Sequence, residues 1–329
     1  ETSDILEIIS QYVDLKQRGA NYFGICPFHS EKTASFSVAP SKQIYHCFGC
    51  NSGGNVFSFI MDYQKTSFPE AVKIVAERYN IKIQLGKNDL ESEFFSGLYH
   101  LHDIAVELYQ SNLFSRDGRK ALNYLYGRGL SEDTIKQFKI GFAKDRWDHL
   151  VNTVKGKGFT KNQINQSGLF TSSDKGCFDR FRSRIMFPIF HPSGKPIAFG
   201  GRIFENDDPA KYLNSPETPL YHKGNIFYGI QATRDSIRKN GCVVLVEGYM
   251  DLLKLYQASV TNILAISGTA FTKKHVSSLH RITKKVIILY DGDSAGANAT
   301  IKAGWTLIKG DLDALVIRPP KGLDPDEWV

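Results

Sequence analysis

The sequence predicts a multidomain protein that combines α+β and α/β architecture. Its 329 residues exceed the roughly 100 to 200 residues of an ordinary domain. The first 85 residues contain short strand-length apolar runs around closely spaced cysteines. The last 90 residues alternate apolar runs with helical patterns, which is typical of a parallel sheet covered by helices. We therefore expect a small N-terminal domain, a mixed α/β subdomain and a C-terminal α/β subdomain with a parallel sheet.

The composition indicates an ordinary globular protein with a basic surface. Hydrophobic residues make up 42% of the chain and charged residues 23%, and no apolar run reaches the roughly 18 residues that a membrane span needs. The first 15 residues lack the features of a secretory signal, so we expect a cytoplasmic protein. The net charge is +7, and residues 180–239 hold ten Lys or Arg against five acids. This charge points to a polyanionic partner.

The first part of the chain is predicted to open with an amphipathic helix from Glu1 to Leu15. The apolar face of this helix comprises Ile5, Ile8, Ile9, Tyr12 and Val13. Strands are expected over residues 22–25, 35–38 and 43–46, and helices over residues 56–63 and 68–79. The turn-forming and charged residues 86–89 predict a linker to the next domain.

Two pairs of potential metal ligands lie between these strands. Cys26 and His29 form one pair and Cys47 and Cys50 the other, with two residues inside each pair. Such spacing lets two tight turns converge on one tetrahedral zinc ion, which predicts a closed, structural Cys3His site of the zinc-ribbon type. His46 is the alternative histidine ligand, although it breaks the paired spacing.

Aromatic residues surround these ligands, and they have two interpretations. With Lys32 and Lys42 nearby, they suit base stacking on single-stranded nucleic acid. They also suit the core of a domain too small to close without them. The residues concerned are Tyr22, Phe23, Phe28, Phe36, Tyr45 and Phe48.

Residues 93–175 are predicted to be mostly helical, and strands follow them. Helical spacing covers residues 94–113 and 120–126, and Ser131 is expected to cap a further helix. Strands over residues 184–190 and 196–203 flank the turn at residues 191–194. This pattern predicts a basic antiparallel hairpin.

Acidic residues follow the predicted strands of the last part. The strands are expected over residues 243–246, 263–266, 286–290 and 314–317, and the helices between them over residues 249–256, 273–281 and 295–308. Glu247 follows the first strand, and Asp291 and Asp293 follow the third. Because ligands of parallel sheets bind beyond the carboxyl ends of the strands, these acids are expected to converge. Residues 324–327 add a further acidic group.

Clustered carboxylates favour bound magnesium or manganese, because the cations neutralise their mutual repulsion. The alternative is that Asp293 and Ser294 only cap the helix that begins near Ala295. Cys177 and Cys242 lie apart from both candidate sites.

These motifs resemble a known family. Glu247-Gly248 together with Asp291-Gly292-Asp293 resembles the signature of the TOPRIM domain, shared by bacterial primases, topoisomerases and some nucleases. Residues 179–189, 199–202 and 211–218 are similar to the DnaG-type DNA primases in particular, as are the two cysteine-containing turns. The resemblance covers nearly the whole chain.

The resemblance implies a DNA-directed RNA polymerase that makes short RNA primers on single-stranded DNA during replication. It implies catalytic roles for Glu247, Asp291 and Asp293, and divalent-cation binding by these three with Asp324 and Asp326. The implied cofactors are one structural zinc ion and two or more Mg²⁺ or Mn²⁺ ions. The basic residues implied for template and nucleotide binding are Arg180, Arg182, Arg202, Lys211 and Lys223. Of these, Arg202 and Lys223 are the preferred triphosphate contacts.

The implied domains are a zinc-binding domain at residues 1–87, an N-terminal polymerase subdomain at 92–240 and a TOPRIM subdomain at 241–329. The expected partners are template DNA, ribonucleoside triphosphates, the RNA product and a replicative helicase that binds through a further C-terminal domain. The expected location is the cytoplasmic replication fork. Two other functions stay open: a TOPRIM topoisomerase or nuclease, and a zinc-dependent single-stranded-DNA-binding module without enzymatic activity.

Overall fold

The computed structural model describes residues 4–64, 66, 68–79, 81, 88–174, 176–205, 210–268, 270–320 and 323–328. The chain divides into two compact units, Glu1–Ser92 and Glu93–Val329. Gly86 and Lys87 of the expected linker lie outside the described residues, and helix α4 begins at Asn88. No helix in the described parts of the chain is both long enough and apolar enough to cross a bilayer.

The first unit is built on an antiparallel sheet with the strand order β1-β2-β3-β4-β5. The strands are β1 (Lys16–Arg18), β2 (Asn21–Gly24), β3 (Phe36–Ala39), β4 (Ile44–Cys47) and β5 (Gly53–Gly54). The helices are α1 (Ile5–Ile9), the 3-10 helix η1 (Pro40–Lys42), α2 (Val56–Gln64) and α3 (Phe68–Arg78). Ile5, Ile8 and Phe59 belong to one core together with strand residues Phe36 and Tyr45.

Helix α1 is shorter than predicted. Asp4 caps its first turn by accepting a hydrogen bond from the Leu6 amide, and the helix ends at Ile9 instead of reaching Leu15. The chain must leave the helix because Lys16 already pairs with Phe23 in the sheet. Val13 is nevertheless buried, so the apolar pattern correctly identified core residues while overestimating the helix.

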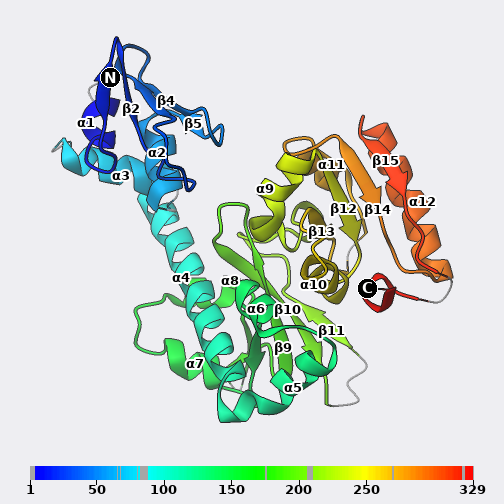
Figure 1. Ribbon diagram of the computed structural model, residues 1–329. Coiled ribbons are helices and arrows are strands. Elements are labelled where there is room, and N and C mark those ends of the chain that lie inside the picture. Colours follow the sequence, from blue (N-terminus) through cyan, green and yellow to red (C-terminus); the bar gives the residue numbers. More distant parts are fainter. Residues whose placement is uncertain are drawn as a thin grey trace. The chain divides into compact units, whose positions relative to one another are not determined.

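The second unit begins with helices that surround a second antiparallel sheet, ordered β11-β10-β9-β6 (Figure 1). The helices are α4 (Asn88–Leu113), η2 (Arg116–Gly118), α5 (Arg119–Gly127), α6 (Glu132–Gln137), α7 (His149–Val154) and α8 (Lys161–Gln166). The strands are β6 (Gly141–Ala143), β9 (Arg184–Phe190), β10 (Pro196–Ile203) and β11 (Tyr212–Asn214), and a separate hairpin joins β7 (Phe170–Ser173) to β8 (Gly176–Asp179). Ser131 caps α6 as predicted, whereas β6 and β7 interrupt the region expected to be mostly helical.

Strands β9 and β10 form the predicted antiparallel hairpin, but they do not present a basic surface. Every residue of β9 is buried, as are all residues of β10 except Ile203. Arg184 and Arg202 lie inside this layer, only 4% and 6% exposed. The Arg184 guanidinium donates to the carbonyls of Gly201 and Ala210, at 3.2 and 3.0 Å. These hydrogen bonds stabilise the positive charge of Arg184 inside the protein, whereas the predicted basic hairpin implied an exposed charge.

The last part forms the predicted parallel sheet, with the strand order β13-β12-β14-β15. Its strands are β12 (Cys242–Val246), β13 (Ile263–Ala265), β14 (Lys285–Ile288) and β15 (Asp313–Val316). The helical segments are η3 (Lys223–Asn225), α9 (Ile230–Asn240), α10 (Tyr249–Gln257), α11 (Lys273–Leu279), α12 (Ser294–Lys309) and α13 (Pro325–Trp328). Because β13 and β14 lie on opposite sides of β12, the strand order reverses between β12 and β14, where such sheets bind ligands.

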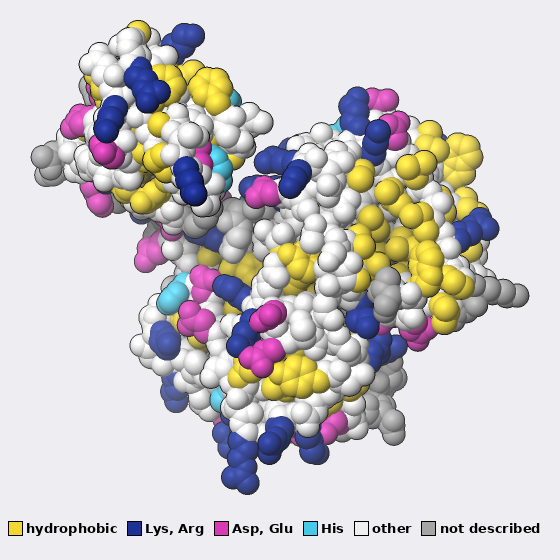
Figure 2. All heavy atoms as spheres, viewed as in Figure 1, with side chains coloured by type: hydrophobic (Ala, Val, Ile, Leu, Met, Phe, Trp, Pro, Cys, Tyr) yellow, Lys and Arg dark blue, Asp and Glu magenta, His cyan; other side chains and the backbone are white. Residues whose placement is uncertain are grey.

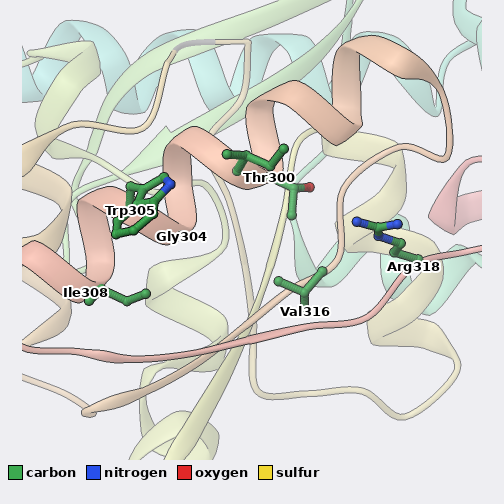
Figure 3. Close-up of a pocket in the computed structure, with 7 residues that line it drawn as sticks. Thr300, Gly304, Trp305, Ile308, Val316 and Arg318 are labelled. Atoms are coloured by element: carbon green, nitrogen blue, oxygen red, sulfur yellow. The ribbon is translucent and has the colours of Figure 1, made fainter.

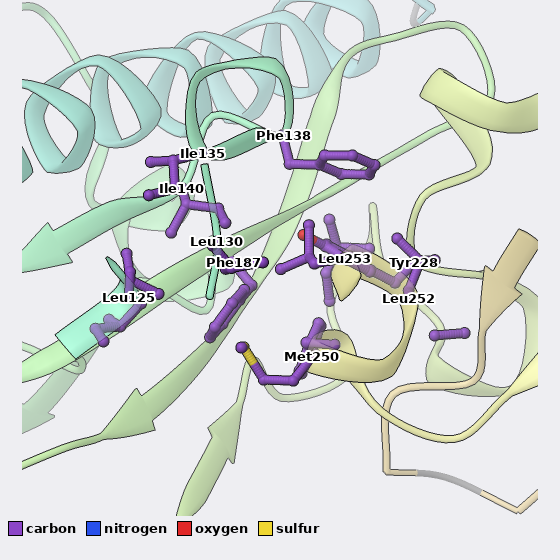
Figure 4. Close-up of a cluster of buried hydrophobic side chains, with 14 of the residues drawn as sticks. Leu125, Leu130, Ile135, Phe138, Ile140, Phe187, Tyr228, Met250, Leu252 and Leu253 are labelled. Carbon is purple, nitrogen blue, oxygen red and sulfur yellow. The ribbon is translucent and has the colours of Figure 1, made fainter. Parts of the chain in front are cut away.

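Both faces of the parallel sheet are buried. Val244 and Val246 belong to a core that includes Met250 and Leu253 of α10 and Phe187 of β9, and Figure 4 shows this cluster. The alternate residues of β12 belong to a second core with side chains of α9, α11 and α12. The period-two alternation of β12 thus sorts its side chains between the two faces. The first core packs the parallel sheet against the antiparallel one.

Helix α12 and strand β15 carry an exposed apolar face, visible in Figure 2. Trp305 is 61% exposed and Leu315 58% exposed. Figure 3 shows Trp305, Ile308 and Val316 lining a groove between the helix and the strand. Since β15 pairs with β14 alone among the described strands, this face lies at the edge of the sheet.

Candidate functional site

The four predicted zinc ligands converge in the first unit. One ligand atom from each of Cys26, His29, Cys47 and Cys50 lies within 4.8 Å of the others. The Sγ atoms of Cys26 and Cys50 are 3.8 Å apart, and Cys47 Sγ is 3.9 Å from His29 Nδ1. Three thiols and one imidazole at this separation suit tetrahedral zinc and leave no coordination position for a substrate.

Glu31 supports this cluster, and the sequence pattern did not single it out. Its Oε1 accepts the Cys26 amide at 2.7 Å, and its Oε2 accepts the Ser35 hydroxyl at 2.5 Å. The same carboxylate lies 3.3 Å from His29 Nε2, the ring nitrogen opposite the one near Cys47. Hydrogen bonds, first that of the Ser35 hydroxyl, hold the pKa of Glu31 below its usual value. Glu31 thereby fixes the orientation of His29.

The aromatic residues around the cluster divide between the two interpretations. Phe36 and Tyr45 are at most 1% exposed and belong to the core. Phe48 is 69% exposed, and its ring lies 4.9 Å from that of His46, which is not part of the metal cluster. Phe48 therefore remains available for stacking, whereas Phe36 and Tyr45 serve the fold.

Predicted acidic residues also converge in the second unit. Glu247 directly follows β12 and Asp291 follows the neighbouring parallel strand β14, so both lie at the carboxyl edge of the sheet. These two residues line one cavity of about 300 Å³ together with Asp324 and Asp326 of the acidic group at the chain's end. Acidic residues from three separate segments of the chain therefore line one cavity, at the point where the strand order reverses.

Asp293 has a different position from the other acids. It is exposed and precedes α12, and its Oδ1 accepts the Gly296 amide at 2.7 Å. This is the helix cap that the alternative interpretation expected. Its charge still reaches the cluster, because it raises the pKa values of Glu247, Asp291 and Asp324. A Cβ atom at Gly296 would lie 2.3 Å from the Asp291 carbonyl oxygen, so only glycine permits this close approach.

Glu247 and Asp291 resist ionisation when no cation is present. Burial, followed by the charges of Asp291 and Asp293, raises the pKa of Glu247 to about 7. Burial, followed by the charge of Asp324, raises the pKa of Asp291 to about 6. Glu247 Oε1 and Asp291 Oδ1 are buried and have no hydrogen-bond partner among the described residues. Buried carboxylate oxygens without partners fit hard divalent cations such as Mg²⁺ or Mn²⁺.

Comparison with known proteins decides the family. In chain order, residues 1–91 match a CHC2 zinc finger model, 108–234 the N-terminal domain of the DNA primase catalytic core, and 244–329 a Toprim-like model. A solved structure of the Aquifex aeolicus primase, comprising zinc-binding and RNA polymerase domains, is 34% identical with a TM-score of 0.67. The match covers 99% of this chain and 79% of that one. The chain belongs to the DnaG-type DNA primases.

Other primases support the same assignment. The DNA primase of Staphylococcus epidermidis is 39% identical over 99% of this chain and 56% of its own length. A DnaG primase catalytic domain solved with single-stranded DNA is 38% identical with a TM-score of 0.65, covering 71% of this chain and 74% of that one. The chain spans about half the length of the full primases it matches. The zinc-finger match and the Cys/His/Cys/Cys cluster support a structural zinc ion, and the Toprim-like region implies divalent-metal binding.

The five basic residues that were predicted to bind template and nucleotide fall into two groups, according to whether they line the acidic cavity. Arg202 and Lys211 line the acidic cavity. Arg202 donates to the Tyr212 hydroxyl, and its guanidinium lies 5.1 Å from the centre of that ring. Arg180, Arg182 and Lys223 are not among the residues that line the cavity.

These three residues have other surroundings. The Arg182 guanidinium lies 3.8 Å from the centre of the exposed Trp147 ring, and Arg180 is half-buried with a lowered pKa because of burial. The backbone amide of Lys223, the first residue of η3, donates a hydrogen bond to Glu217 Oε1 at 2.9 Å. Lys211, but not Lys223, therefore lies beside the carboxylates.

Two charged residues of the cavity were not predicted from the sequence. Asp251 on the first turn of α10 is 7% exposed and accepts the Gly248 amide at 2.8 Å, which holds the turn that carries Glu247. Burial, followed by the charge of Asp291, raises the pKa of Asp251 to about 7. Its spacing four residues after Glu247 was a usable signal, because α10 begins between them. Arg128 follows α5 and pairs with Asp326; nothing in the sequence linked residues so far apart.

Proposed function

We propose that this chain carries the zinc-binding part and the beginning of the catalytic part of a primase that synthesises short RNA primers on single-stranded DNA. The observation that supports the proposal most strongly is the shared cavity of Glu247, Asp291, Asp324 and Asp326, with Arg202 and Lys211 on its wall. Carboxylates paired with basic side chains suit nucleotidyl transfer, in which divalent cations and triphosphate oxygens must meet.

In this proposal Glu247, Asp291 and Asp293 are the catalytic acids, and together with Asp324 and Asp326 they hold two or more Mg²⁺ or Mn²⁺ ions. Bound cations of this kind lower the pKa of an attacking hydroxyl and neutralise charge on triphosphate oxygens. Alternatively, Glu247 relays a proton as a general acid or base.

Basic side chains then position the phosphates. Lys211 is exposed at the cavity and supplies a mobile positive charge, whereas Arg202 is held in place by Tyr212 and supplies a fixed one. Arg180, Arg182 and Lys223 are assigned to the template strand. The stack of Arg182 on Trp147 offers an aromatic surface beside a positive charge, which suits the bases and phosphates of a single strand.

The zinc-binding part is proposed to contact the template through exposed side chains such as Phe48. A similar primase catalytic domain has been solved with single-stranded DNA, which supports a template of this kind. The division into residues 1–87, 92–240 and 241–329, the location at the replication fork and a helicase partner remain predictions from the family resemblance.

The proposal is tested by incubating the chain with single-stranded DNA, ribonucleoside triphosphates and Mg²⁺ or Mn²⁺. Short RNA products support a primase, cleaved DNA supports a TOPRIM nuclease or topoisomerase, and binding without products supports a non-enzymatic module. If the chain needs residues found only in longer primases, it is tested within a full-length chimera with one of its relatives.

Asp291→Asn is the decisive variant for the catalytic assignment. Removing a cation-binding carboxylate is expected to lower primer synthesis by about 100-fold or more. The melting temperature is expected to stay the same or rise, because the variant removes charge from a repulsive cluster. Asp313→Asn is the matched control, since Asp313 is an exposed acid of β15 in the same sheet. Full synthesis by Asp291→Asn contradicts the assignment.

A further inference from the structure

A second cavity, which shares no lining residue with the acidic one, lies between α9, α11 and the turn after β9. Its volume is about 180 Å³. Arg234 and Arg238 lie four residues apart on α9, and Arg281 approaches from the segment after α11. Among the described residues, no acidic side chain lines this cavity. Three guanidinium groups around one small space create a site for a negatively charged group.

The arginines of this cavity form few ion pairs or hydrogen bonds with the rest of the described chain. Arg238 and Arg281 are exposed, and neither has an ion pair or a hydrogen bond within the described part of the chain. Arg234 lies 3.7 Å from the carboxylate of Asp235, and its guanidinium donates to the Pro192 carbonyl at 3.5 Å. Exposed arginines often contribute only solubility, but these three line the same cavity.

The remaining lining is apolar and contains one acceptor without a donor. Ile226, Ile230 and Ile282 supply an aliphatic wall. Asn225 also lines the cavity, and its buried Oδ1 has no hydrogen-bond partner among the described residues. A ligand that fits must therefore supply negative charge and an aliphatic group.

We propose that this cavity binds an acidic peptide segment of a partner protein, anchored by one aliphatic side chain. Carboxylates of the peptide pair with Arg234, Arg238 and Arg281, and the aliphatic side chain enters between the isoleucines. Nucleic acid fits less well, because the isoleucines offer no aromatic surface and Phe227, the aromatic residue of the lining, is 2% exposed and closed to base stacking.

The test measures binding of fluorescein-labelled Glu-Asp-Leu-Glu-Asp peptide to the full chain by fluorescence anisotropy. Arg238→Glu and Arg281→Glu are each expected to weaken binding at least about 10-fold, the loss of one charge-assisted pair. Arg119→Glu makes the same charge change at an exposed residue of α5 outside the cavity and is expected to leave binding unchanged. A second peptide with Ser in place of Leu is expected to bind more weakly, because it leaves the apolar wall uncovered.

Three results overturn the proposal. The first is absence of peptide binding at millimolar concentration. The second is equal binding by the wild type, Arg238→Glu and Arg119→Glu, which indicates only nonspecific charge attraction. The third is binding of an oligo(dT) strand at this cavity in place of the peptide. It would be recognised because Arg238→Glu and Arg281→Glu lose oligonucleotide binding, whereas Arg119→Glu retains it. Circular dichroism of each variant establishes that it is folded.

Discussion

At the scale of single residues, Glu31 shows how a side chain outside the metal site controls it. It joins the Cys26 amide, the Ser35 hydroxyl and His29 Nε2 through one carboxylate. The Ser35 hydroxyl also lies 3.1 Å from Cys47 Sγ, so these contacts connect three of the four ligands. Removing this carboxylate keeps all four zinc ligands but removes the hydrogen bonds that orient them.

Glu31→Gln is therefore expected to weaken zinc binding about 10 to 100-fold, the usual effect of removing a carboxylate that orients a metal-bound histidine. Competition with a chromogenic chelator measures the change. Glu77→Gln serves as the control, because Glu77 is an exposed residue of α3 in the same unit. Unchanged zinc affinity in Glu31→Gln means that the carboxylate does not orient His29.

The zinc ligands themselves were predictable from sequence because each pair lies on a tight turn, where spacing determines geometry. Glu31 was not, since its role depends on the turn bringing it back toward Cys26 and Ser35. Arg128 was less predictable still, because its partner Asp326 is 198 residues away and no local pattern joins them. The burial of Arg184 and Arg202 was not predictable, because periodicity does not reveal a buried charge that is satisfied by backbone carbonyls or aromatic rings.

At the scale of secondary structure, Asp293 has two separable roles at the start of α12. Its Oδ1 caps the helix, while its charge acts on the neighbouring carboxylates. Asp293→Ser keeps an oxygen for the Gly296 amide but removes the charge. Asp293→Ala removes both and is expected to lower stability by about 1 kcal/mol.

If Asp293 contributes to catalysis, both variants lose primer synthesis, and only Asp293→Ala also loses stability. Urea unfolding and primer synthesis are measured on the same preparations. Full activity of Asp293→Ser restricts Asp293 to capping the helix.

Helix α4 contains a buried histidine that predicts a pH dependence of stability. His102 is fully buried and stacks on Phe199, its Nδ1–H donates to the Leu98 carbonyl, and its Nε2 has no partner among the described residues. Burial lowers the pKa of His102 from 6.5 to about 4. The unfolded chain therefore binds a proton that the folded chain rejects, so stability is lost as pH falls from 6.5 toward 4.

When the pH falls from 7 to 5, the free energy of unfolding of the wild type is expected to decrease by about 2 kcal/mol more than that of His102→Leu, which has no imidazole to protonate. Urea unfolding at both pH values measures the difference. His100→Leu is the control, because His100 is exposed on the same helix. Equal losses in the wild type and His102→Leu contradict the lowering of the His102 pKa by burial.

At the scale of the whole molecule, the parallel sheet explains both the success and the limits of the sequence analysis. Strand alternation and acidic residues after β12 and β14 correctly predicted that Glu247 and Asp291 share one edge. The sequence did not show which other segments complete the cavity. Arg202 comes from the antiparallel sheet and Arg128 from the helical region, and both lie close only because the two sheets pack through a common core.

The central claim is that Glu247 and Asp291 bind a divalent cation in common. Anomalous diffraction from crystals soaked in Mn²⁺ tests it most directly. We predict at least one Mn²⁺ ion with carboxylate oxygens of Glu247 and Asp291 at about 2.0 to 2.2 Å, and its loss in Asp291→Asn crystals. Mn²⁺ found only away from these two carboxylates, or no bound ion in wild-type crystals, would contradict the account.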